Sequence, residues 1–391
     1  METQSTIIPE AVSTAAAGAR RAELFSPYMQ FAKLRIRARY TLASSGVRPL
    51  TMKRLLELAG GGPRLEELAL NSAGDYGYVP LQAALARKAG VKEENIVAST
   101  GCSLANHLAF AALLEPGDEA LIEAPAYELM ESTARFLGAR IRHFERRHEE
   151  GYRLDPDRIA QAMSPATRLI VITNLHNPSG ALAEPEALRE IGRRARRQGT
   201  YVLVDEVYLE MDFDRRQPSA FTLGDNFIVT SSLTKAYGLG GLRCGWIVAP
   251  AEMARRMWRL DDLFAATAVH VGEQLSVVAL EHLEAIAADS RALLERNRRL
   301  LDRFLDAHPE LETLRPPMGT IVFPRLRGAA DAGPWLERLR SEYEVSLGPG
   351  AYFGAPAHFR LGIGGETTEL EAGLERLGKA LEKSSRHKAE G

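Results

Sequence analysis

Apolar and polar residues alternate in two kinds of block along the first two thirds of the chain. Short runs that are almost entirely apolar, such as Leu169–Ile172 and Tyr201–Val204, are separated by longer stretches in which apolar residues recur every three or four positions. A short apolar run predicts a strand buried on both faces, and the longer period predicts an amphipathic helix. This alternation predicts an α/β fold: a three-layer, doubly wound, mostly parallel sheet.

The expected strands of this sheet are short and rich in aliphatic residues, and they cover 95–99, 120–123, 140–144, 167–173, 201–204, 227–230 and 244–248. Helices with one apolar face are expected between them, at 104–114, 130–136, 156–163 and 184–198. Each strand is therefore followed by a covering helix or a return loop, as a doubly wound sheet requires.

The pattern changes in the last third of the chain. A long helical stretch at 272–307 is followed by shorter strands and helices between 320 and 381, which predict a smaller α/β domain. We therefore expect an N-terminal arm contributing to the small domain (1–49), a large ligand-binding domain (50–275) and a C-terminal small domain (276–391).

Composition restricts the class of protein. The chain has 391 residues, 45% apolar and 26% charged, with a formal net charge of -2, which argues against binding to nucleic acid or an anionic membrane. Cys102 and Cys244 have no metal-binding spacing, so neither a zinc site nor a disulfide framework is expected. No signal peptide is recognisable and no apolar run approaches the roughly 18 residues of a membrane span, so we expect a cytoplasmic protein with small-molecule partners.

Candidate chemistry follows from asking which polar residues come directly after each strand, because ligands of open α/β sheets bind at the carboxyl ends of the strands. Asn177 follows one strand in the run Asn-Pro-Ser-Gly, and Asp205 ends the next strand, with Tyr208 three residues later. The following strand leads to Lys235, and Arg243 comes eight residues after it. We expect these side chains to converge on one crevice.

One ligand would use all of these groups: pyridoxal phosphate. Lys235 would hold its aldehyde as a Schiff base, and burial beside cationic groups would lower the pKa of the amine as that reaction requires. Asp205 would pair with the protonated ring nitrogen, and Asn177 and Tyr208 would hydrogen-bond the ring oxygen.

The phosphate of this cofactor is expected at a helix start. Gly101, Cys102 and Ser103 open the helix after the first strand, where free backbone N–H groups and the helix dipole favour an anion. Ser232 and Arg243 would complete the phosphate site, since the arginine fork matches phosphate oxygens.

Alternative interpretations of single motifs are weaker. The run Gly238–Gly245 is not GxGxxG, because the third glycine position is Arg243, so a dinucleotide site is not expected. Cys102 lacks a recognisable base partner and is expected to contribute its backbone N–H, and His107, His176 and His270 are expected to be structural.

At this point the chain resembles a known family, the fold-type I pyridoxal-phosphate enzymes and in particular the class I/II aminotransferases. The resemblance extends over about 40–380 and rests on Asn177-Pro-Ser-Gly180, then Asp205 and Tyr208, then Ser232-Leu-Thr-Lys235 with Arg243 and Gly245. It implies the corresponding fold, the cofactor, and a homodimer with active sites at the subunit interface.

The resemblance also implies residue roles that the pattern alone does not give. Tyr127 resembles the aromatic residue that stacks on the cofactor ring, Arg360 the clamp for the substrate carboxylate, and Gly46 a backbone contact to that carboxylate. The tyrosine that in this family contacts the cofactor phosphate across the dimer is missing: its position is Ser72, so either Tyr76 substitutes from a neighbouring position or the contact is absent.

The function implied is transfer of an amino group between an L-amino acid and a 2-oxo acid, with Lys235 moving the proton. The same site supports a lyase or a side-chain cyclase, because the cofactor carries the electronic work and the pocket selects the bond that breaks. A cofactor-binding regulatory module is a third class, which the lack of a recognisable N-terminal helix-turn-helix argues against.

Overall fold

The computed structural model describes residues 25–390 apart from 35, 37, 62–64, 74–75 and 215, with 384–390 described only by their backbone. The first 24 residues of the expected N-terminal arm therefore lie outside the described part. Within the described part, no helix is both long and apolar enough to cross a bilayer.

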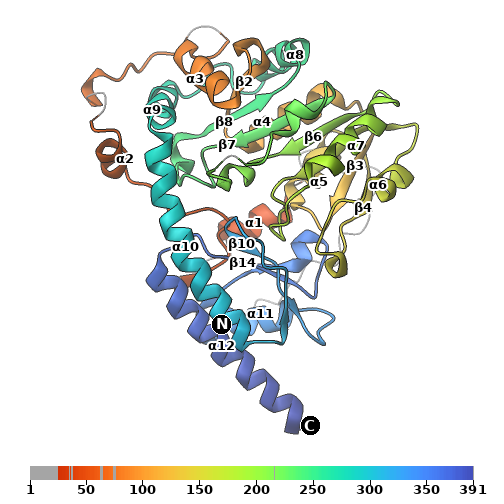
Figure 1. Cartoon of the computed structure of the whole chain (residues 1–391), viewed down its shortest axis with the longest axis vertical. Coiled ribbons are helices and arrows are strands. Elements are labelled where there is room, and N and C mark those ends of the chain that lie inside the picture. The colour runs from red at the N-terminus through yellow and green to blue at the C-terminus, as the bar shows by residue number, and fades with distance from the viewer. Residues whose placement is uncertain are drawn as a thin grey trace, which may run out of the picture.

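A seven-stranded sheet forms the centre of the larger part of the molecule, with the order β2-β8-β7-β6-β5-β3-β4 (Figure 1). Its strands are β2 (Ile96–Thr100), β3 (Glu119–Ala124), β4 (Arg140–Glu145), β5 (Thr167–Thr173), β6 (Tyr201–Asp205), β7 (Phe227–Ser232) and β8 (Cys244–Val248). All of these were expected from the sequence. β8 runs antiparallel to both of its neighbours and the pairs among β3 to β7 are parallel, which confirms a mostly parallel sheet.

Helices cover both faces of this sheet, so it has the predicted three layers (Figure 1). One face carries α4 (Cys102–Leu113), α5 (Glu128–Phe136) and α8 (Ala251–Asp261), and the other carries α3 (Val79–Ala89), α6 (Pro156–Ala162), α7 (Pro185–Arg196) and α9 (His270–Glu281). Leu203 packs in the cluster on the first face, and its neighbours Val202 and Val204 in the cluster on the second. Burial of both faces explains why the strands are apolar at every position.

The remaining elements form a smaller part below the sheet in Figure 1. Its helices are α1 (Pro27–Leu34), α10 (Leu283–Ala307), α11 (Gly333–Tyr343) and α12 (Thr367–Glu390), whereas α2 (Met52–Leu58) lies at the level of the sheet in Figure 1 and contacts α10. Its strands are β1 (Tyr40–Thr41), β9 (Leu311–Glu312), β10 (Ile321–Val322), β11 (Arg325–Leu326), β12 (Val345–Ser346), β13 (Gly348–Pro349) and β14 (Phe359–Gly362). β1 pairs in parallel with β12, so chain segments from both ends of the sequence meet here.

Two features of the helices differ from the expectation. The single helical stretch expected at 272–307 is two helices, α9 and α10, because His282 leaves the helical conformation at φ -116° and ψ 23°. No proline or glycine occurs at that break, and the spacing of apolar residues continues across it, so the sequence predicts one helix. α8, which follows Pro250, was not expected at all.

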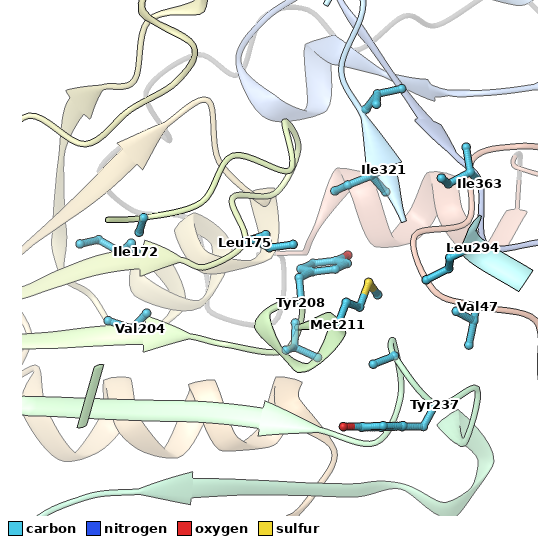
Figure 2. Packing of buried hydrophobic residues seen from close by; sticks show 14 of the residues in the cluster. Val47, Ile172, Leu175, Val204, Tyr208, Met211, Tyr237, Leu294, Ile321 and Ile363 are labelled. Carbon is cyan, nitrogen blue, oxygen red and sulfur yellow. The ribbon is translucent and has the colours of Figure 1, made fainter. Parts of the chain in front are cut away.

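The apolar core is continuous between the two parts. Figure 2 shows buried side chains that extend from Ile172 on β5 and Val204 on β6, past Tyr208, to Ile321 on β10 and Ile363 after β14. The carboxyl ends of β5, β6 and β7 therefore lie against the smaller part.

Candidate active site

The carboxyl ends of the central strands bring the predicted polar residues to one edge of the sheet. Thr173 pairs with Asp205, and Asp205 pairs with Thr230, so β5, β6 and β7 end at nearly the same level. Antiparallel β8 begins where these strands end, and its Gly245 lies opposite Ser232 on one side and Ser99 on the other. The edge is thus built from five adjacent strands.

Lys235 lies in the loop between β7 and β8. Its Nζ donates a hydrogen bond to Ser45 Oγ at 3.0 Å, and its carbonyl oxygen accepts from Val47 N at 2.9 Å. A Cβ added to Gly46 would lie 3.4 Å from Lys235 Cα, so the segment 45–47 lies directly against the lysine. Burial lowers the pKa of the Lys235 amine, which favours the neutral, nucleophilic form.

Asp205, at the end of β6, is 4% exposed and accepts hydrogen bonds only from neutral donors among the described residues. The donors are Asn106 Nδ2 at 2.9 Å, Val207 N at 3.0 Å and the Cys102 thiol at 3.5 Å. Burial raises the pKa of the Asp205 carboxyl despite these bonds. A buried carboxylate without an ion-pair partner is costly, and a protonated pyridine nitrogen would supply the missing cation. The site therefore fits pyridoxal phosphate at this atom.

The expected phosphate site is at the start of α4. Gly101 is the N-cap residue and has a φ of 82°, in the left-handed region that favours glycine. A Cβ at Gly101 would overlap the Arg243 guanidinium, and a Cβ at Gly245 would overlap the backbone of Gly101 and Cys102. Both glycines are needed for this close packing.

The side chains around that helix start differ in exposure. Arg243 and Ser103 are exposed, whereas Ser232 is fully buried. Arg243 Nη2 donates to Thr100 O at 3.2 Å, which holds the guanidinium over the end of β2. Backbone N–H groups of Cys102 and Ser103 begin α4 and have no partner within the helix, as an anion site requires.

Arg360, on β14, is 1% exposed and is brought to the sheet edge by the smaller part of the molecule. Its Nη1 donates to Asn177 Oδ1 at 3.0 Å, so two residues that the sequence places 183 positions apart are in contact. Its Nη2 donates to Tyr28 Oη at 2.6 Å and to Ala43 O at 3.0 Å.

Asn177 owes its position to a tight turn after β5. His176 N donates to Ala181 O at 2.8 Å, and the buried His176 ring contacts Ser179 Oγ at 2.6 Å and Pro125 O at 2.8 Å. Burial holds the pKa of His176 well below its usual range, so the ring is neutral and braces the turn.

The two tyrosines of the predicted site lie near Arg360, Tyr208 buried and Tyr127 partly buried. Tyr127 is the N-cap residue of α5, and its ring makes an edge contact with the ring of Tyr28, with centroids 5.5 Å apart. Tyr208 follows β6 and shares Ser45 with Lys235 as a hydrogen-bonding partner. Burial raises the pKa of both phenols, which keeps them protonated as hydrogen-bond donors.

The Cys102 thiol contacts Asp205, and burial together with that carboxylate raises the thiol pKa well above its usual value. A protonated thiol is a poor nucleophile, which agrees with a supporting role. Tyr76, considered as a substitute for the missing phosphate tyrosine, is 57% exposed, and its hydroxyl contacts Asp262 at 3.2 Å. Ser72 is exposed.

The sequence predicted no polar contact for three residues of this site. Ser45 binds the Lys235 amine, Asn106 binds Asp205 and also accepts from Thr230 Oγ1 at 2.6 Å, and Tyr28 binds Arg360. Asn106 is one turn after Cys102 on the same helix, so its polar side chain on an otherwise apolar face was the available signal. Nothing local distinguishes Ser45 or Tyr28.

Fold and site together define a pyridoxal-phosphate-dependent enzyme of the aminotransferase type: a doubly wound sheet with a buried lysine, a buried carboxylate and an arginine at the strand ends. The chain belongs to the aminotransferase class I and II family, whose profile matches residues 49–377. This family membership confirms the predicted fold, the cofactor and aminotransferase activity.

The named relatives and solved structures include a synthase, a transaminase, an aminotransferase and a cyclase. Capreomycidine synthase of Streptomyces vinaceus is 31% identical over 90% of this chain and 92% of its own, and the arginine–pyruvate transaminase AruH of Pseudomonas aeruginosa is 30% identical over 70% and 71%. A pyridoxal-phosphate-dependent aminotransferase from Streptococcus suis superposes with a TM-score of 0.83 at 29% identity, covering 88% of this chain and 94% of that one. The pyridoxal-phosphate-dependent cyclase OrfR has a TM-score of 0.82 at 25% identity, covering 95% and 100%.

Proposed function

We propose that Lys235, Asp205 and Arg360 carry the amino-group transfer of this aminotransferase, between an L-amino acid and a 2-oxo acid. The proposal is carried by the buried Asp205 carboxylate at the end of β6, whose hydrogen-bond donors among the described residues are all neutral. The neighbouring strand β7 leads to Lys235, and the pKa of the Lys235 amine is lowered. In this assignment Lys235 holds the cofactor aldehyde and Asp205 holds its ring nitrogen.

The other cofactor contacts are assigned by position. Tyr127 stacks on the ring, Asn177 and Tyr208 bind the ring oxygen, and the phosphate lies at the start of α4 with Gly101, Cys102, Ser103, Ser232 and Arg243 around it. The helix start and the exposed guanidinium of Arg243 support this placement.

When bound, pyridoxal phosphate supplies an electron sink for the bond that breaks at the substrate α-carbon. Lys235 takes the α-proton as a neutral amine, and burial, which lowers the pKa of this amine, favours that form. Ser45 orients the amine through the 3.0 Å bond to Nζ. Arg360, with Asn177 and the backbone of Gly46, binds the substrate α-carboxylate and so aligns the α-carbon.

A panel assay tests the assignment. Purified protein is incubated with individual amino acids and either pyruvate or 2-oxoglutarate, and alanine or glutamate formation is measured. Lys235→Ala should lose both this activity and the visible absorption band of lysine-bound cofactor. If the variant kept that band, the assignment of Lys235 would be wrong.

Side-chain cyclisation is the second candidate. It is supported by the 31% identity to capreomycidine synthase over nearly the whole of both chains, together with the fold similarity to OrfR. The panel separates the two: transamination needs the 2-oxo acid, whereas cyclisation or elimination consumes the amino acid without one and is followed by mass spectrometry. A product that forms only with the acceptor present would reject the cyclase.

A homodimer is proposed from an exposed apolar patch, defined as Leu70, Tyr76, Val79, Leu263, Phe264 and Val269. Its two segments lie side by side, since Tyr76 contacts Asp262 and Ala69 N donates to Gln274 Oε1 at 3.2 Å. Exposed apolar residues gathered in this way indicate a protein interface. A cytoplasmic location is proposed from the two cysteines, which are both free thiols.

A further inference from the structure

The Arg360 guanidinium already has hydrogen-bond acceptors where a carboxylate would bind. A carboxylate binds arginine best through two parallel N–H groups on one edge of the fork. A guanidinium has two such edges, Nη1 with Nη2 and Nε with Nη2, and both include Nη2. In this structure the two N–H groups of Nη2 donate to Tyr28 Oη at 2.6 Å and to Ala43 O at 3.0 Å. The Nε–H of Arg360 is buried without a partner.

A bidentate carboxylate must therefore replace one of the two acceptors on Nη2. Ala43 O belongs to a backbone segment fixed on both sides of the chain: Leu42 N donates to Ser346 O at 2.9 Å, and Leu42 O accepts from Gly362 N at 2.7 Å. Tyr28 Oη belongs to a side chain, which needs only a rotation or a small shift of α1 to leave. The hydroxyl is the acceptor that can be exchanged.

The surroundings of the Tyr28 ring hold its hydroxyl against Arg360 in the free enzyme. Its ring contacts the rings of Tyr127 and Phe353, with centroids 5.5 and 5.6 Å apart, and the Arg360 guanidinium lies 5.5 Å from the Tyr28 centroid. α1 is itself attached to α5, because Ser26 Oγ donates to the Glu128 carboxylate and accepts from Met29 N at 3.1 Å.

We propose that Tyr28 is a specificity-determining residue whose hydroxyl takes the place of the substrate carboxylate on Arg360 in the free enzyme. Every substrate must displace it, so Tyr28 weakens the binding of all α-carboxylates by the same factor and excludes ligands that cannot form the full bidentate contact. The proposal rests on the assignment of Arg360 as the carboxylate clamp.

The test is the affinity of the cofactor-loaded enzyme for propionate, which has the carboxylate of an amino acid but no amine, measured by calorimetry. Tyr28→Phe keeps the ring and removes the competing hydroxyl, so propionate should bind about tenfold more tightly, as expected for loss of one hydrogen bond to a charged group. KM for the amino acid and for the 2-oxo acid should fall by a similar factor. Damage to the fold would weaken binding, so a gain cannot arise from misfolding.

Two controls define the result. Tyr152→Phe removes a hydroxyl from the same aromatic cluster, where it contacts His148 at 3.1 Å, and should leave propionate affinity unchanged. Arg360→Ala should abolish propionate binding. Equal or weaker binding by Tyr28→Phe would overturn the proposal, and weaker binding would make the hydroxyl a ligand of the carboxylate. Propionate has no amine to react with the cofactor, so a failed Lys235 assignment leaves this test interpretable.

Discussion

Buried carboxylates near the ends of β3 and β6 differ in the groups that neutralise them. Glu123 forms an ion pair with Arg146 at 2.8 Å, and both side chains are essentially inaccessible to solvent. Glu206 accepts a hydrogen bond from Ala220 N at 2.6 Å, while Asp205 accepts only from neutral donors among the described residues. Of these three carboxylates, Asp205 is the one at the proposed cofactor site, where it contacts Asn106 and Cys102 of α4 and where a cationic ligand would neutralise it.

Glu206 makes stability depend on pH. Burial, reinforced by the Glu210 carboxylate, raises the pKa of Glu206 to about 7. The folded state therefore holds a proton that the unfolded state releases, so this group stabilises the fold at low pH, and that contribution is lost as pH rises through about 7. Relative to Glu206→Gln, the wild-type free energy of unfolding should fall by about 3 kcal/mol between pH 4 and pH 8.

Urea unfolding of both proteins at each pH checks this, since the other titrating groups cancel in the difference. A difference independent of pH would show that Glu206 stays ionised in the folded protein. The side-chain amide oxygen that the substitution introduces can still accept from Ala220 N, so the comparison isolates the charge.

Among single residues, the sequence predicted those that follow a strand as part of a recognisable motif. Lys235, Asp205 and Asn177 come directly after strands, so topology alone brings them together. Ser45 and Tyr28 reach the site through the packing of α1 and the 42–48 segment on β14, a long-range contact that no local pattern encodes.

Among the elements, α10 connects the two parts of the molecule, running from α9 beside the sheet to α12 (Figure 1). Asn297 in its middle is fully buried, and its Nδ2 donates to Ile363 O at 2.7 Å and Gly365 O at 2.8 Å. These carbonyls directly follow β14, the strand that carries Arg360. α10 therefore fixes the position of Arg360, the proposed carboxylate clamp.

Asn297→Ala should lower the free energy of unfolding by about 2 kcal/mol, because the buried Ile363 carbonyl and the partly buried Gly365 carbonyl lose their donor. It should also raise KM for both substrates severalfold, because β14 is no longer held. Asn95→Ala is the matched control: Asn95 Nδ2 also donates to a backbone carbonyl, Ala249 O at 2.9 Å, but far from Arg360. Similar stability losses with an unchanged KM in both variants would argue against a positioning role for α10.

Strands were easier to predict than helix ends. A strand buried on both faces has to be apolar throughout, so β5 and β8 begin and end where expected. The break between α9 and α10 at His282 is not marked by a proline or glycine, so the sequence gives no sign of it. α8 was missed because Pro250, which precedes it, comes shortly after the end of β8 and so predicts the end of that strand and not the start of a helix.

For the whole molecule, the exposed apolar patch predicts the assembly state. Leu263 is 77% exposed, and replacing it with aspartate should place a charge in the proposed dimer interface. Sedimentation should change from twice the chain mass of 42.9 kDa to the single mass, with loss of activity at low protein concentration. Leu34→Asp, at a position 69% exposed on α1, should remain dimeric, and a wild-type protein that sediments as a monomer would refute the interface.

The reversed direction of β8 has a consequence for the cofactor site. A parallel strand in its place would need a crossover of a dozen or more residues, which would carry the chain away from this edge of the sheet. Because β8 turns back directly, the connection 233–243 is a hairpin that places Lys235 near one end and Arg243 at the other. One short loop thereby spans the proposed cofactor from aldehyde to phosphate, and the size of the ligand sets the length that this loop can have.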